Sequence, residues 1–145
     1  MYKHILLPID GSERSLRAAK AGIELAKICQ AHVHALHVIA PFQTIAYLSA
    51  ILAATQYAYN EEARTHAERY LADVRAIAEA AGVPFDAQVL FGSQPSEMIV
   101  QTAKDKQCDL VVMASHGWSG MTRLLLGSET QKVLLSSDTP VLVYH

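Results

Sequence analysis

Short apolar runs recur along the chain and are separated by longer segments with a different pattern. Most of these runs are nearly continuous in apolar residues, which is typical of strands that are buried on both faces of a sheet. The expected strands are Ile5–Ile9, Val33–Ile39, Pro84–Phe91, Asp109–Ser115 and Pro140–Tyr144.

The segments between these runs carry the spacing of amphipathic helices. Leu16, Ala19, Ile23 and Ala26 recur at steps of three and four residues, which places them on one helical face. A longer series of the same kind runs from Ala63 to Ala81. Helices are expected from Ser12, over Ala63–Ala81 up to Gly82, from Pro95 to about Lys106, and from Gly127-Ser128 to about Leu135.

Strands that alternate with helices predict an α/β protein, with a parallel sheet covered by helices on both faces. Right-handed crossovers then leave few possible topologies. Ligands of such sheets bind beyond the carboxyl ends of the strands, where the winding direction reverses. The residues after the first and fourth strands are therefore the first place to look for a site.

The segment Pro41–Asn60 has no charged residue and is long enough to raise the question of a membrane span. Its polar residues argue against a span: Gln43, Thr44, Ser49, Thr55, Gln56 and Asn60. We interpret it as a loop and the start of a helix that cover something apolar, and we expect no stable membrane insertion.

Composition narrows the class of protein further. The chain has 145 residues, which fits one domain over 1–145, and 51% hydrophobic with 18% charged residues argues against disorder. A net charge of −2 provides no broad surface for nucleic acid. Cys29 and Cys108 make no disulfide framework, and the first apolar run is too short for a signal peptide, so we expect a cytoplasmic protein with buried thiols.

A glycine loop follows the fourth strand and leads into the last helix. Met113-Ala114-Ser115-His116-Gly117 is separated by nine residues from Gly127-Ser128-Glu129-Thr130. Glycine amides approach phosphate oxygens closely, and the first turn of a helix offers unpaired N–H donors at the positive end of its dipole. This pattern predicts a phosphate site that needs no net positive charge. Ordinary turn glycines are the alternative.

Other candidate chemistries find less support. His32 and His34 would point to one face of their strand and His37 to the other, so we expect no zinc site. The sequence has no P-loop lysine motif and no Gly-X-Ser-X-Gly elbow. We expect Ser115 and His116 to point apart as adjacent strand residues, and His116 to contact a ligand instead of acting as a base.

Two features flank the proposed phosphate loop. Arg123 and Lys132 are the nearest cations in the sequence, and each would either screen the phosphates or lie on solvated surface. Solvated surface fits Lys132 better, and both roles stay open for Arg123. The interval Trp118–Leu126 is largely apolar, which predicts that it is buried in some state, either as a lid or against a partner or Pro41–Asn60.

Four separated motifs resemble the universal stress protein family. They are Ile5-Leu6-Leu7-Pro8-Ile9-Asp10-Gly11-Ser12, Leu36-His37-Val38, the run Cys108 to Gly117 with Leu125-Leu126-Gly127-Ser128, and Pro140-Val141-Leu142-Val143. The resemblance implies a three-layer α/β/α fold with a five-stranded parallel sheet in the order 3-2-1-4-5, the adenine nucleotide alpha-hydrolase-like fold. It also implies a homodimer through the C-terminal strand, which as an apolar edge would otherwise lie unpaired.

The nucleotide-binding branch of that family carries Gly, two residues, Gly, nine residues and then Gly-Ser or Gly-Thr. Gly117 and Gly127-Ser128 match the second and third parts, whereas Ala114 replaces the first glycine. A site that needs φ above zero at Ala114 would be compromised, but one with strand geometry would not.

The resemblance implies ATP, or AMP or ADP, as ligand, with Mg²⁺ or Mn²⁺ bound through the phosphates. Asp10 would contact the ribose, or alternatively cap the first helix. Pro8, Ile9 and the backbone of Val38 would hold the adenine, and Met113, Ala114 and Ser115 would form the floor. The ribose and phosphates would be surrounded by His116, Gly117, Gly127, Ser128, Glu129 and Thr130.

Three functions follow from this resemblance. The first is a nucleotide-responsive stress regulator or binding module, in which the nucleotide orders the Gly117–Gly127 loop. The second is a slow ATPase, which ranks lower because no complete general-base arrangement is present in the sequence. The third is a nucleotide-free dimeric stress protein, which the replacement by Ala114 leaves open.

Overall fold

The computed structural model describes residues 1–41, 49–117 and 125–145, apart from the side chains of 49–52. Strands and helices alternate along the chain, as the apolar pattern predicts. Their bounds are β1 His4–Pro8, α1 Glu13–Cys29, β2 His32–Ile39, α2 Ser49–Ala81, β3 Phe85–Phe91, α3 Pro95–Asp105, β4 Leu110–Ala114, α4 Ser128–Ser136 and β5 Val141–Tyr144.

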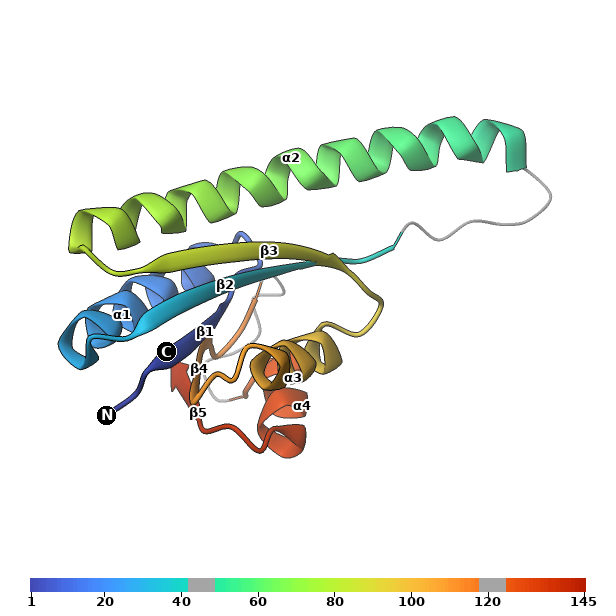
Figure 1. Cartoon of the computed structure of the whole chain (residues 1–145). Coiled ribbons are helices and arrows are strands. Elements are labelled where there is room, and N and C mark those ends of the chain that lie inside the picture. Colours follow the sequence, from blue (N-terminus) through green and yellow to red (C-terminus); the bar gives the residue numbers. More distant parts are fainter. Residues whose placement is uncertain (42–48, 118–124) are drawn as a thin grey trace.

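The strands form one parallel sheet in the order β3-β2-β1-β4-β5. Helices α1 and α2 cover one face, and α3 and α4 cover the other, which gives three layers (Figure 1). The predicted fold is therefore confirmed. β1 lies in the middle of the sheet between β2 and β4, so the winding direction reverses beside its carboxyl end.

Each face of the sheet has its own core because successive strand residues point to opposite sides. In β1, Ile5 and Leu7 pack under α1 and α2, while Leu6 packs with Leu36 and Val111 under α3 and α4. All five side chains are essentially inaccessible to solvent. Burial on both faces explains why these strands are apolar at nearly every position.

The turn between β1 and α1 is built by Asp10, Gly11 and Ser12. Ser12 is the N-cap of α1, and its hydroxyl oxygen accepts a hydrogen bond from the Ser15 amide at 3.1 Å. Asp10 does not cap the helix, because its Oδ1 accepts from the Ser12 amide at 2.8 Å inside the turn. Gly11 has φ +84°, a conformation that side chains disfavour.

Helix α2 begins at Ser49, well before the series from Ala63 that predicted it. Its N-terminal part runs past the edge of the sheet (Figure 1). The side chains of residues 53–58 are all exposed, so the expectation that this segment covers something apolar is wrong for them. Residues 42–48 lie outside the described part of the chain. No helix among the described residues is both long and apolar enough to cross a bilayer.

Candidate functional site

A cavity of about 350 Å³ opens at the carboxyl edge of the sheet, on the face covered by α3 and α4. It lies where the chain leaves β1, β2 and β4, and the start of α4 closes one side. The lining residues are Pro8, Ile9, Asp10, Ser15, Leu36, Val38, Pro95, Ile99, Met113, Ala114, His116, Gly117, Gly127, Ser128, Glu129 and Thr130.

Every predicted site residue except Ser115 lines this cavity. Ser115 is buried behind the wall, where its carbonyl oxygen accepts the Gly127 amide at 2.7 Å. The lining also includes residues that were not predicted: Ser15, Leu36, Pro95 and Ile99. Leu36 lies two positions before Val38 on the same strand face, so the strand period alone could have indicated it.

The cavity has an apolar part and a polar part. Leu36, Val38, Ile99 and Met113 provide aliphatic and thioether surface from the sheet and α3, whereas the Ile9 side chain packs into the core on the opposite face. Asp10, Ser128, Glu129 and Thr130 contribute oxygen atoms around the turn after β1 and the start of α4. Such a cavity suits a ligand with one flat apolar portion and one polar or anionic portion.

The polar part is built on the N-terminus of α4. Gly127 is the N-cap and, as a glycine, has no side chain that could occupy the helix start. The first hydrogen bond of the helix runs from the Gln131 amide to the Gly127 carbonyl at 3.0 Å. The amides of 128–130 therefore precede the helical hydrogen-bond ladder and point toward the helix start. The Thr130 hydroxyl donates to the Ala114 carbonyl at 2.9 Å, which joins α4 to the end of β4.

Two positions of the glycine motif leave little room for a side chain. A Cβ at Gly117 would overlap the Asp10 carboxylate, and a Cβ at Gly127 would lie 3.2 Å from the Ser115 carbonyl oxygen. Ala114, in contrast, belongs to β4 and has ordinary strand geometry. Replacement of the first motif glycine by Ala114 therefore strains no backbone here.

Glu129 ties α4 to α3 beside the cavity. Its Oε2 accepts the Ser96 amide at 2.9 Å, at a helix start where Gln94 provides no side-chain cap, and its Oε1 accepts from Lys132 at 2.9 Å. Burial alone would raise the pKa of Glu129, but these hydrogen bonds and the Lys132 charge hold it below its ordinary value. Lys132 is exposed and does not line the cavity.

Ser115 and His116 do not point apart, so that expectation is wrong. Both lie beyond the last residue of β4, where strand alternation no longer applies, and Ser115 Oγ is 3.0 Å from His116 Nδ1. His116 is buried at the cavity wall, and its Nε2 has no hydrogen-bond partner. Among the described lining residues it is the one side chain that can carry positive charge. Arg123 and the interval 118–124 lie outside the described residues.

The three strand histidines do not converge. His34 and His32 both interact with Asp86, and His32 Nε2 lies 3.5 Å from Asp86 Oδ2. His37 is on the opposite face of β2 and reaches the Ile9 carbonyl. Within residues 1–41, 49–117 and 125–145, no group of three or more His, Cys, Asp or Glu side chains could hold a metal ion.

A three-layer α/β/α fold with strand order 3-2-1-4-5 and a cavity at its switch point is the adenine nucleotide alpha-hydrolase-like architecture. The chain belongs to the universal stress protein family, whose family model matches residues 1–145. It is 34% identical over 143 residues to universal stress protein MJ0531 of Methanocaldococcus jannaschii, a match that covers 99% of this chain and 82% of that protein.

Solved structures agree with this assignment. The structure of hypothetical protein MJ0577, from Methanocaldococcus jannaschii, has a TM-score of 0.83 and 29% identity, and the match covers 99% of this chain and 95% of that one. A universal stress protein in complex with cAMP has a TM-score of 0.74 at 24% identity, covering 99% and 97%. The Archaeoglobus fulgidus universal stress protein in complex with dAMP has a TM-score of 0.70 at 20% identity, covering 98% and 97%.

Proposed function

We propose that this protein binds an adenine nucleotide in the cavity and acts as a nucleotide-responsive stress regulator or binding module. One observation carries the proposal: the apolar end of the cavity, Asp10, and the start of α4 line a single space at the switch point. The neighbours with cAMP and dAMP share the fold, and the residues of this chain supply the remaining argument.

Each part of the cavity fits one part of a nucleotide. The base would lie against the apolar side chains of Val38 and Met113, at the end of the cavity that Ile9 also lines. The Asp10 carboxylate would accept hydrogen bonds from ribose hydroxyls. The phosphate oxygens would accept hydrogen bonds from the amides of 128–130 at the positive end of the α4 dipole.

We propose ATP as the ligand, or AMP or ADP, with Mg²⁺ or Mn²⁺ bound through the phosphates. The cavity carries two carboxylates, Asp10 and Glu129, and Glu129 is already engaged by Ser96 and Lys132. A divalent cation held by phosphate oxygens together with one or two protein carboxylates is the usual arrangement for Mg²⁺. The ion would offset repulsion between the phosphates and these carboxylates.

Calorimetry of the purified protein with ATP, ADP and AMP, with and without Mg²⁺, tests the proposal. Heat of binding and a rise in melting temperature are expected for at least one of these ligands, and no such response for GTP. Absence of both signals at millimolar adenine nucleotide would overturn the proposal. ADP that accumulates above a buffer control would instead identify the slow ATPase.

Gly117→Ala should weaken binding about tenfold or more, which corresponds to about 1.4 kcal/mol. The added methyl group would overlap the Asp10 carboxylate and displace it from the sugar. Gly92→Ala is the matched control, because its Cβ would meet only the flexible Met98 side chain, outside the cavity. Equal affinity of Gly117→Ala and wild type would place the ligand elsewhere.

We also infer a two-fold dimer through β5, the strand at the open edge of the sheet. The Pro140 carbonyl accepts a hydrogen bond from Val111 of β4, and the Tyr144 carbonyl accepts one from Ser115 just after β4. By strand alternation, the backbone groups of Val141 and Val143 therefore point to the open edge. An apolar edge of this kind is a template for pairing with a second copy. Leu142 and Tyr144 remain 43% and 37% exposed beside it.

A further inference from the structure

The turn that carries Asp10 is supported from the face of the sheet opposite to the cavity. His37 Nδ1 lies 2.6 Å from the carbonyl oxygen of Ile9, the residue just before Asp10. A carbonyl oxygen can only accept, so His37 Nδ1 must carry the hydrogen and donate it. The bond therefore fixes the imidazole in one tautomer and holds the end of β1 against β2.

Tyr70 of α2 contacts both His37 and the turn that carries Asp10. Its ring packs edge-on against His37, with ring centroids 5.6 Å apart. The same ring lies directly under Gly11, where any Cβ would overlap it. Because Gly11 has φ +84° and no side chain, the turn can rest directly on the aromatic ring.

Asp10 is thus held between two fixed points. On one side its neighbour Ile9 is bonded to His37, and on the other its own Oδ1 accepts the Ser12 amide at 2.8 Å. None of the described α2 residues lines the cavity, and neither does His37. His37 and Tyr70 nevertheless contact the turn that carries Asp10, and Asp10 does line the cavity.

We propose that His37 and Tyr70 are positioning residues that hold the Asp10 carboxylate where it binds the nucleotide sugar. This inference rests on the proposed function, because His37 and Tyr70 can position Asp10 for a nucleotide only if the cavity binds one. It makes α2 part of the binding machinery through an aromatic contact behind the sheet. A shift of α2 would then change the affinity of the cavity for the nucleotide.

The first test compares AMP affinity across single variants. His37→Leu removes the donor and should weaken binding about fivefold or more, while His37→Gln keeps an N–H group and should lose less. Tyr70→Ala removes the ring beneath Gly11 and should have an effect like that of His37→Leu. Tyr70→Phe keeps the ring and should bind as wild type does, since the contacts of Tyr70 with His37 and Gly11 in the described part of the chain are made by its ring.

The decisive test is a double-mutant cycle with Asp10→Ala. If His37 acts through Asp10, the double variant His37→Leu with Asp10→Ala should bind no more weakly than Asp10→Ala alone. Melting temperatures should fall further in the double variant, because the packing loss remains. Additive losses of affinity would show that His37 only stabilises the fold, and would overturn the inference.

The outcomes separate this inference from the function on which it rests. If wild type binds no adenine nucleotide, the proposed function fails and the support has no ligand to position. If wild type binds and the cycle is additive, only the inference fails. If Tyr70→Ala does not fold, the His37→Leu and His37→Gln pair still decides, because equal affinity of both with wild type contradicts it.

Discussion

Asp86 on β3 lies between two histidines of β2. His34 Nδ1 donates to its Oδ1, and His32 approaches its Oδ2. Burial alone would raise the pKa of Asp86, but its hydrogen bonds with both histidines and their charges outweigh that effect and hold it below its ordinary value. The folded protein therefore favours the ionised carboxylate more than the unfolded chain does.

The interaction of Asp86 with the two histidines determines how the stability of the fold changes in acid. Since the pKa of Asp86 is lower in the folded state, its contribution to stability is present above the unfolded value of about 3.9 and is lost as pH falls through the folded pKa. Asp86 is 50% exposed, so Asp86→Asn should cost only about 1 kcal/mol at pH 7.

Urea unfolding of wild type and Asp86→Asn across pH 3–7 measures this contribution. The difference between the two should be present at pH 5 and above and should shrink below pH about 4. Asp138→Asn is the control, because Asp138 is 90% exposed in its pair with Lys104. A gap between wild type and Asp86→Asn that stays constant down to pH 3 would contradict the assignment.

The sequence predicts which residues line the cavity where the backbone pattern determines their positions. Gly117 and Asp10 follow strand ends, Gly127 stands at the start of α4, and parallel strands bring their carboxyl ends to one edge. Pro95 and Ile99 escape prediction because only the packing of α3 on the sheet brings them to the cavity. The orientation of Ser115 depended on where β4 ends, which apolar patterning does not resolve.

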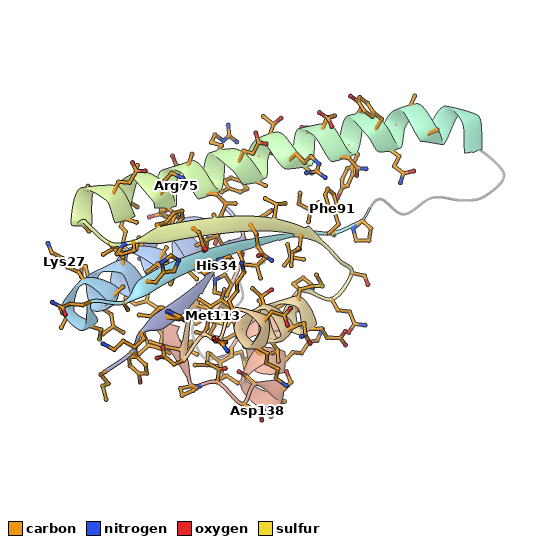
Figure 2. All side chains as sticks on the ribbon, in the orientation of Figure 1. Lys27, His34, Arg75, Phe91, Met113 and Asp138 are labelled. Atoms are coloured by element: carbon orange, nitrogen blue, oxygen red, sulfur yellow. The ribbon has the colours of Figure 1, made fainter. Side chains whose placement is uncertain are left out.

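Helix α2 shows how support by the sheet varies along one element. Near the end of β3, Arg64 stacks over the Phe91 ring at 4.9 Å, and Phe91 lies under α2 in Figure 2. The Tyr59 hydroxyl donates to the Ala40 carbonyl at 2.9 Å. Closer to the N-terminus, the side chains of residues 53–58 are exposed, so that segment gains little from packing on the sheet.

Two alanine-to-glycine substitutions should separate these regions. Ala67 of α2 is fully buried, so Ala67→Gly should cost about 1–2 kcal/mol through lost helix propensity and lost burial of a methyl group. Ala54→Gly should change the free energy of unfolding by less than about 0.5 kcal/mol, because that turn frays before the fold unfolds. Denaturant unfolding measures both, and equal costs would mean that the exposed turn is packed in solution.

The same contrast explains which elements the sequence predicts. The strands, the layers and most helix bounds agree with the apolar pattern, because every one of those elements buries a face. The start of α2 does not, since residues 53–58 face no core and carry no apolar stripe from which a helix could be recognised. A hydrophobic pattern reflects burial, and residues 53–58 are exposed in the described part of the chain.

On the scale of the whole molecule, the cavity and the open edge of β5 lie on different parts of the sheet. β5 follows β4 at the end of the strand order, whereas the cavity forms around the ends of β1, β2 and β4. Dimerisation through β5 would therefore leave the cavity accessible. The two proposals can be tested independently on the same preparation.

Val143→Pro should convert a dimer to a monomer. The Val143 amide points to the open edge, so proline there removes a hydrogen-bond donor needed for pairing with a second β5, and the bonds to β4 from the neighbouring residues remain. Val143→Thr keeps the amide and the branched shape and should remain dimeric. Light scattering after size exclusion at micromolar concentration should give twice the 15.8 kDa chain mass for wild type and Val143→Thr, and a single chain mass for Val143→Pro. A wild type that is monomeric at this concentration contradicts the interface, and so does a Val143→Pro variant that folds and stays dimeric.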